Sequence, residues 1–169
     1  MYQNDFREES MKVTILAVGK IKEKFYRQAI GEFEKRLSRY CKLEFIEVAD
    51  EKTPDHASSA EEAQIKEKEG LRLLKHIRED AWVCALAIEG KMLDSVEFSE
   101  KIESLGVSGV SHVMFVVGGS LGLAESVLKR ADYALSFSKM TFPHQLMRVI
   151  LLEQVYRSFR IMAKQPYHK

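Results

Sequence analysis

The sequence predicts a single α/β domain built on a mostly parallel β-sheet. Three observations support this fold class: apolar runs alternate with amphipathic segments, two of those runs are continuously apolar, and glycine directly follows two of the predicted strands. Continuous apolar runs are typical of central parallel strands covered on both faces. We expect the order βαβαβαβαβα within residues 11–169, with no linker, repeat or second domain.

The first half of the chain contributes two strands and two helices. Residues 12–19 form an apolar strand that ends in glycine, and residues 43–48 form a shorter strand. Between them, residues 21–40 place apolar side chains at spacings of three and four, which predicts an amphipathic helix. That apolar stripe consists of Tyr26, Ile30, Phe33, Leu37 and Tyr40. A polar loop at 50–60 leads to a charged helix at 61–77.

The second half opens with the two continuously apolar strands, residues 82–88 and 113–117. Between them, Asp94 precedes a helix with Glu97 at the capping-box position, and Gly106 marks the end of that helix. The inward-facing residues of this helix are expected to be Phe98, Ile102 and Leu105. The sequence therefore places a helix between two central strands, as a parallel sheet requires.

The candidate ligand site lies at the ends of the last two strands. A glycine-rich turn, residues 118–122, follows the fourth strand. A short helix and a strand at 134–137 come next, and then a polar and aromatic loop before a final helix at 143–163. Ligands of open α/β sheets bind beyond the carboxyl ends of strands. The turn has neither P-loop nor GxGxxG spacing, and an ordinary tight turn is an alternative. Two such loops side by side can hold a flat, partly polar cofactor.

Composition excludes several classes of protein. The 169 residues are 46% hydrophobic and 30% charged, with a net charge of +1, so overall charge favours neither a nucleic-acid nor a membrane partner. Cys41 and Cys84 belong to no Cys/His cluster, which predicts reduced thiols, no metal and a cytoplasmic protein. The apolar runs are far shorter than the roughly 20 residues that cross a bilayer, so we expect no membrane association.

Residues 1–10 differ from the rest of the chain because they are polar and show no periodicity. We expect them to be a disordered extension outside the fold, which begins at Met11. Codons for Arg7, Glu8 and Glu9 can spell a ribosome-binding sequence, so a translated leader is our hypothesis for this decapeptide, and an ordinary disordered tail is the alternative.

Two further patterns point to partners. The final helix is apolar on more than one face, which favours packing against a second copy of the chain, with deep burial inside one domain as the alternative. Residues 139–169 carry six Lys or Arg against one acid, and residues 20–42 carry eight against three. Such clusters favour a polyanion-binding face, and solvated helix faces are the ordinary alternative.

Several of these segments resemble a known family. The chain from 11 to 169 is similar, in register, to the RlmH family, the bacterial 23S rRNA pseudouridine N3-methyltransferases of the SPOUT superfamily. The likeness is carried by residues 15–20, 115–122, 135–145, 152–157 and 167–169. It implies a single-domain SPOUT-type α/β knot, in which the C-terminal segment threads a trefoil knot. It also implies a homodimer with its knots and active sites at the interface.

The resemblance further implies a site for S-adenosylmethionine. The implied cofactor-binding residues are Leu86, Gly118, Phe137, Ser138, Lys139, Met140, Thr141 and Phe142. Backbone groups of the turn and loop can hydrogen-bond the adenine edge while apolar side chains cover its face. Without the resemblance, Leu86 and Phe137 are interpreted as core residues, and Ser136 or Ser138 as caps of the loop. A surface charge is the alternative for Lys139, but its place in the loop favours contact with RNA or with the cofactor carboxylate.

The candidates for catalysis or RNA binding are His168, Tyr167, Lys169 and Arg148. The imidazole of His168 can accept a proton, Tyr167 can stack on a base, and Lys169 can hold a phosphate. Arg148 can stabilise developing charge. The residue that acts as the base is left open, and His144, Gln145 and Glu153 are candidates for structural hydrogen bonds.

The implied reaction is methylation of N3 of a pseudouridine in the 23S rRNA stem-loop that faces the small subunit, on assembled 70S ribosomes. Two other classes are considered. A non-enzymatic ribosome-binding assembly factor uses the same basic faces without binding S-adenosylmethionine. A nucleotide-dependent α/β enzyme needs a phosphate-binding lysine or an acidic ribose ligand, and neither is found in its usual place. Cofactor binding discriminates among the three.

Overall fold

The computed structural model describes residues 10–169 and confirms the alternation of strands and helices. All of the proposed extension except Ser10 lies outside the described residues. The elements in chain order are β1 (Lys12–Val18), α1 (Lys24–Leu37), β2 (Lys42–Val48), α2 (Ser59–Leu74), β3 (Trp82–Met92), α3 (Ser95–Val107), β4 (His112–Val117), α4 (Glu125–Arg130), β5 (Tyr133–Ser136) and α5 (His144–Met162).

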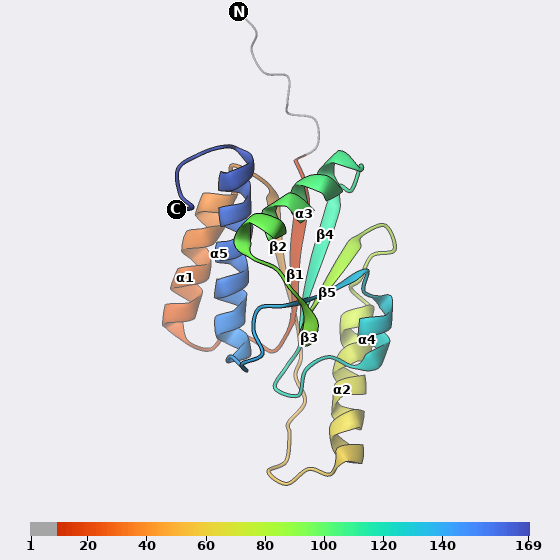
Figure 1. Ribbon diagram of the computed structural model, residues 1–169. Helices are drawn as coiled ribbons and strands as arrows, with labels where there is room; N and C mark the ends of the chain where they lie inside the picture. The colour runs from red at the N-terminus through yellow and green to blue at the C-terminus, as the bar shows by residue number, and fades with distance from the viewer. Residues whose placement is uncertain (1–9) are drawn as a thin grey trace, which may run out of the picture.

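The five strands form one sheet in the order β2-β1-β4-β3-β5, and every pairing is parallel. Because all strands run the same way, their carboxyl ends share one edge, at the lower end of the sheet in Figure 1. The helices that follow return along the faces of the sheet. This arrangement brings the loops after β1, β3, β4 and β5 to a single edge.

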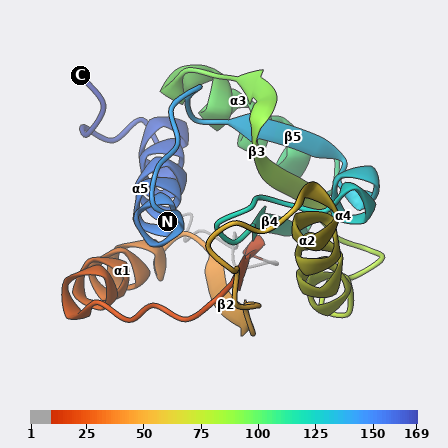
Figure 2. The ribbon, with the colours of Figure 1, turned by 90° about the horizontal axis from the view of Figure 1, so that it is seen from below.

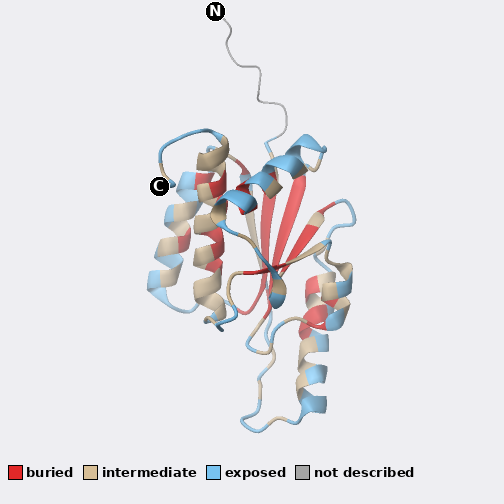
Figure 3. Ribbon diagram, in the orientation of Figure 1, coloured by how far each residue is buried: buried red, intermediate tan, exposed pale blue. Residues whose placement is uncertain are grey.

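Both faces of the sheet are covered. Helices α1, α3 and α5 lie on one face, and α2 and α4 lie on the other (Figures 1 and 2). Successive side chains of β1 therefore enter different cores: Ile15 packs with the first group of helices and Leu16 with the second. All six residues of β4 are buried, as expected for a central strand (Figure 3).

The helix boundaries follow local capping signals. Asp94 and Glu97 form the predicted capping box of α3. A second capping box, of Ser58 and Glu61, starts α2 earlier than expected. The apolar stripe of α1 is confirmed, with Leu37 fully buried, but α1 begins at Lys24 rather than near residue 21.

Strand β3 is longer than the apolar pattern predicted. It continues past Ile88 to Met92, and its pairing with β5 shifts register between Leu86 and Lys91. A Cβ atom at Gly90 would lie 2.6 Å from the carbonyl oxygen of Ala134, so glycine permits this close approach. Hydropathy did not predict residues 89–92 as part of this strand because Glu89 and Lys91 are charged.

Helix α5 packs between α1 and α3 on one face of the sheet. Its buried side chains are Arg148, Leu151, Leu152, Val155 and Ser158, and none of its other residues is highly exposed. Contacts within one chain therefore absorb much of its apolar surface. The homodimer and the trefoil knot stay predictions. Within residues 10–169, no helix combines the length and hydropathy that a membrane crossing requires.

The two cysteines are buried, free thiols. Burial raises the pKa of Cys41 to about 12 and that of Cys84 to about 12, so both stay protonated at neutral pH. This environment fits the expectation of structural, unreactive cysteines.

Candidate active site

A pocket of about 670 Å³ opens at the carboxyl edge of the sheet. Its walls come from the middle of β3, the ends of β4 and β5, the loops that follow β4 and β5, the first turn of α5, and single residues of α2 and α4. Most of the lining is apolar, and it includes one lysine, Lys66, and one acid, Glu89. Hydroxyl groups come from Ser120, Ser136, Ser138 and Thr141. The volume and composition are typical of a pocket for a small organic ligand.

The glycine turn after β4 forms one wall of this pocket. A Cβ atom at Gly118 would lie 2.8 Å from the carbonyl carbon of Gly122, so the turn closes on itself more tightly than a side chain allows. Gly122 has a φ of +87°, in the left-handed region. Behind the turn lies Glu69, a buried acid of α2 that accepts a hydrogen bond from the backbone N–H of Glu51 at 3.0 Å.

Glu69 is a residue that sequence reasoning missed. A Cβ atom at Gly119 would lie 3.3 Å from both of its carboxylate oxygens, so this acid backs the turn directly. Burial raises the pKa of Glu69, and the hydrogen bond from Glu51 opposes that shift. In the sequence, Glu69 is one of many acids on a charged helix, and no local signal marks it as buried.

The loop after β5 forms the opposite wall. The hydroxyl of Ser136 donates to the carbonyl oxygen of Ser138 at 3.0 Å, and the Ser138 hydroxyl accepts from the N–H of Met140 at 3.0 Å. These bonds fix a compact turn in a loop without regular secondary structure. Ser136 and Ser138 thus shape the loop, and both also line the pocket.

The structure brings together seven of the eight predicted cofactor residues. Those that line the pocket are Leu86, Gly118, Phe137, Ser138, Met140, Thr141 and Phe142. The eighth, Lys139, is exposed and does not line it. Met140 is 71% exposed, so it lies at the mouth of the pocket rather than at its base.

His144 is a pocket residue that the sequence analysis treated only as a structural hydrogen-bonder. It begins α5 and lines the pocket, and its Nε2 lies 4.0 Å from the position of a Cβ on Gly19. Burial lowers the pKa of His144 and Arg148 lowers it further, while Asp50 opposes them. The imidazole is therefore mostly neutral at pH 7, a state in which one ring nitrogen can accept a proton.

Arg148 lies one turn further along α5 and does not line the pocket. Its guanidinium donates to the carbonyl oxygens of Val18 and Gly19 at 2.8 and 2.7 Å, and it pairs with Glu47 at 2.7 Å. The residue is 1% exposed. In this chain Arg148 therefore holds the end of β1 against α5.

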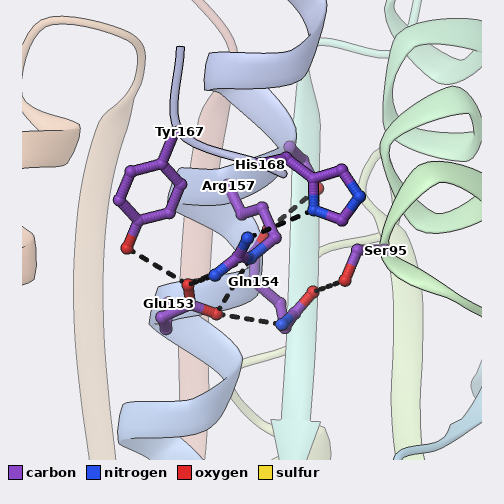
Figure 4. Close-up of polar contacts among 7 residues, drawn as sticks. Ser95, Glu153, Gln154, Arg157, Tyr167 and His168 are labelled. Carbon is purple, nitrogen blue, oxygen red and sulfur yellow. Dashed lines mark hydrogen bonds and ion pairs between the residues drawn. The ribbon is translucent and has the colours of Figure 1, made fainter.

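The C-terminal tail lies elsewhere on α5. The Tyr167 hydroxyl donates to Glu153 at 3.2 Å, and the Nδ1 atom of His168 lies 3.2 Å from a guanidinium nitrogen of Arg157 (Figure 4). Arg157 itself pairs with Glu153 at 2.6 Å. None of Tyr167, His168 and Lys169 lines the pocket of the same chain. The tail is thus docked on its helix, and the two groups of predicted site residues remain apart within one copy.

The fold is that of an α/β protein with a ligand pocket between a glycine turn and a C-terminal loop. Within this class, the chain belongs to the SPOUT methyltransferase family. The family model, described as a predicted SPOUT methyltransferase, matches residues 11–168. Residues 10–169 contain no group of three or more side chains that could hold a metal ion.

Curated relatives match nearly the whole chain. A ribosomal RNA large subunit methyltransferase H from Bifidobacterium adolescentis is 65% identical over 94% of this chain and 100% of its own length. Proteins of the same name from Clostridium botulinum and Clostridium kluyveri are 62% and 60% identical over the same shares. The resemblance to the RlmH family is therefore confirmed.

Proposed function

We propose that this protein methylates large-subunit ribosomal RNA with S-adenosylmethionine as the methyl donor. The observation that carries the proposal is the pocket: seven predicted cofactor residues from separate parts of the sequence line one cavity. The chain around that pocket is 65% identical to a ribosomal RNA large subunit methyltransferase H.

The residues present fit the proposed cofactor. The apolar side chains of Leu86, Phe137 and Phe142 can cover the faces of adenine, and the backbone of the turn and loop can hydrogen-bond its edge. Lys66 supplies a cation for a carboxylate. When bound, S-adenosylmethionine supplies a methyl group activated by its sulfonium.

The chain's own residues then have to align the nucleotide and manage one proton. We propose N3 of a pseudouridine as the acceptor, in the 23S rRNA stem-loop that faces the small subunit, on 70S ribosomes. His168 and Tyr167 are the proposed base and stacking groups, and Lys169 the proposed phosphate contact. Arg148 acts as a positioning residue through the end of β1.

We further propose that the protein works as a homodimer. The tail lies apart from the pocket of its own chain, so the proposed groups can meet only if the tail moves or if two copies share a site. An interface at the active sites satisfies the second condition. We propose the cytoplasm, where ribosomes are found, as the place of action.

The test is methyl transfer from tritiated S-adenosylmethionine to 70S ribosomes lacking the modification, with mass spectrometry to locate the methylated nucleotide. We expect transfer to one pseudouridine of the large-subunit RNA and calorimetric binding of the cofactor. Transfer to another nucleotide would correct the target. A protein that binds ribosomes but not the cofactor would be the non-enzymatic assembly factor.

A further inference from the structure

The first turn of α1 presents an exposed aromatic ring. Phe25 is 59% exposed and is the one large, exposed hydrophobic side chain of α1. Its ring centroid lies 4.3 Å from that of Tyr26, with the two planes tilted by 53°. A single exposed ring is ordinary on a protein surface, so its meaning depends on what surrounds it.

Four exposed cations surround this ring in the sequence: Lys20, Lys22, Lys24 and Arg27. None of them forms an ion pair with any of residues 10–169. Glu23 is the only acid between them. We call Lys20, Lys22, Lys24, Phe25 and Arg27 the basic-aromatic patch. Its positive charge is available to an outside partner.

The segment that carries the patch is hydrogen-bonded to β2 and to the first turn of α5, next to the pocket residue His144. The backbone N–H of Lys22 donates to the side-chain oxygen of Gln145 at 3.3 Å, and that of Ile21 donates to Glu47 at 3.0 Å. Lys20 follows Gly19, whose Cβ position lies 4.0 Å from Nε2 of the pocket residue His144. Helices α1 and α5 begin at the same end of the molecule (Figure 1). The patch therefore lies close to the end of the pocket that His144 lines.

We propose that the basic-aromatic patch is an RNA-docking surface, on which an unpaired base stacks against Phe25 while the cations hold the flanking phosphates. The proposal rests on the proposed function, because it deepens how the RNA substrate is held. Unstacked bases of RNA loops commonly stack on aromatic side chains, and lysines and arginines neutralise phosphates. A ring between cations combines both contacts.

RNA fits this surface better than a protein partner does. A protein interface needs a broad apolar centre, whereas Phe25 is one ring flanked by charges. Stacking requires only one exposed face of the Phe25 ring, and every nucleobase has an aromatic face that can stack on it. The excess of cations matches a polyanion.

The first experiment measures the dissociation constant for 70S ribosomes by co-sedimentation with the full-length protein. We expect Phe25→Ala to weaken binding about tenfold, the loss typical of one base stack, and Phe25→Tyr to restore it. The matched control is Val107→Ala, which trims another exposed apolar side chain, at the far end of α3. Binding of S-adenosylmethionine should be equal in all four proteins, since Phe25 does not line the pocket.

The second experiment separates charge from stacking through salt. For three phosphate contacts, Lys20→Gln, Lys22→Gln and Lys24→Gln together should reduce the slope of log affinity against log salt by about 2. Phe25→Ala should leave the slope unchanged. Single Lys22→Gln should act in the same direction as the triple variant, and Lys75→Gln, at the end of α2, should have no effect.

Two outcomes would overturn the inference. Parent-like affinity and salt slope in the Phe25 and lysine variants, with parental methyl transfer intact, would show that RNA docks elsewhere while the proposed function stands. A loss seen with ribosomes but not with deproteinised ribosomal RNA would assign the patch to a ribosomal protein. Absence of methyl transfer by the parent protein is a different result, because it bears on the proposed function alone.

Discussion

Arg148 shows how one buried side chain can determine the shape of the site. It joins the carbonyl oxygens of Val18 and Gly19 to Glu47, and its Nε atom has no partner among residues 10–169. Breaking a buried ion pair by removing one partner typically costs about 3–5 kcal/mol. We expect Arg148→Leu to lie at the lower end, about 3 kcal/mol, because Glu47 is partly exposed and can hydrate.

Urea denaturation of Arg148→Leu and Glu47→Gln checks this prediction. Glu47→Gln should cost less, because it leaves the two carbonyl bonds of Arg148 in place. A loss below about 1 kcal/mol for Arg148→Leu would mean that solvent replaces the guanidinium easily, against the burial seen here.

His112, at the amino edge of the sheet, should make stability depend on pH. Its Nε2 lies 2.8 Å from the buried Thr14 hydroxyl, which also contacts Glu44. Burial lowers the pKa of His112 and Lys12 adds to the shift, while Asp80 and Glu44 oppose it. The unfolded chain therefore takes up a proton first, at a pKa of about 6.5. Stability should be full above that value and should fall as the pH drops below it.

The measurement compares the free energy of unfolding of the parent and His112→Gln between pH 7.5 and 5.5. The parent should lose stability toward acid pH, and the variant should lose less. The variant should keep some dependence, because the pKa of His144 is lowered in the same direction. Identical slopes for both proteins would show that His112 is not part of the effect.

Gly118 is the residue at which an added side chain should distort the wall of the pocket. The closest atoms to its Cβ position are backbone atoms of Gly122, at 2.8 and 2.9 Å, so the turn itself must move. We expect Gly118→Val to abolish calorimetric binding of S-adenosylmethionine. Gly31→Val is a control on an open helix surface, where nothing lies within 4 Å. Parent-like cofactor binding by Gly118→Val would remove this turn from the site.

At the residue scale, the sequence predicts which residues line the pocket better than it predicts how each side chain is buried and bonded. The pocket residues could be named because a motif of this length is specific to a family. The burial of Arg148 and Glu69 could not, because it depends on contacts with β1, β2 and the glycine turn, far away in the chain. The proximity of His144 to Gly19 could not be predicted either, because these residues are also far apart in the chain.

At the scale of elements, we expect the C-terminal tail to be needed for methyl transfer but not for cofactor binding in the pocket. Tyr167 packs edge-on against Tyr156 at 5.0 Å, and Arg157 lies over its ring. Ending the chain at Pro166 removes these contacts and the hydrogen bonds of the tail to Glu153 and Arg157, none of which lies in the pocket. We therefore expect a folded protein with nearly parental cofactor affinity. Methyl transfer should fall by a factor of about 10² to 10⁴, as for loss of a positioned base.

Parallel measurements of cofactor binding and methyl transfer on the truncated chain and on His168→Ala test this separation. His168→Ala should show part of the loss. Full transfer by the truncated chain would remove the tail from the active site and leave the pocket residue His144, or Lys139 of the neighbouring loop, as the better candidate for catalysis.

Element boundaries show what hydropathy can and cannot predict. The strands and helices with strong periodicity were identified correctly, including α3 with its Asp94 capping box. The capping box of Ser58 is the same signal, but it lay inside a stretch assigned to a loop. The extension of β3 through Gly90 is stabilised by its pairing with β5, and a pairing between distant segments leaves no local trace.

At the scale of the whole molecule, the sheet order separates neighbours in sequence from neighbours in space. Two of the four pairings, β1 with β2 and β3 with β4, join consecutive strands, whereas β1 also pairs with β4, and β3 with β5. The fold class could be predicted because alternating strands and helices permit few architectures. The order of the strands could not, since it reflects packing of both helical layers at once.

That strand order also has a kinetic consequence. Strand β4 must insert between β1 and β3, which precede it in the chain, so the sheet cannot be completed until most of the chain is available. Folding through such distant contacts is slow. The glycine turn and the loop after β5 come from this late part of the chain, so the pocket forms only as the sheet closes. In stopped-flow experiments, S-adenosylmethionine should therefore leave the refolding rate unchanged and slow unfolding. A nascent chain that ends before β5 lacks part of the pocket, so the cofactor can stabilise only the complete, folded protein.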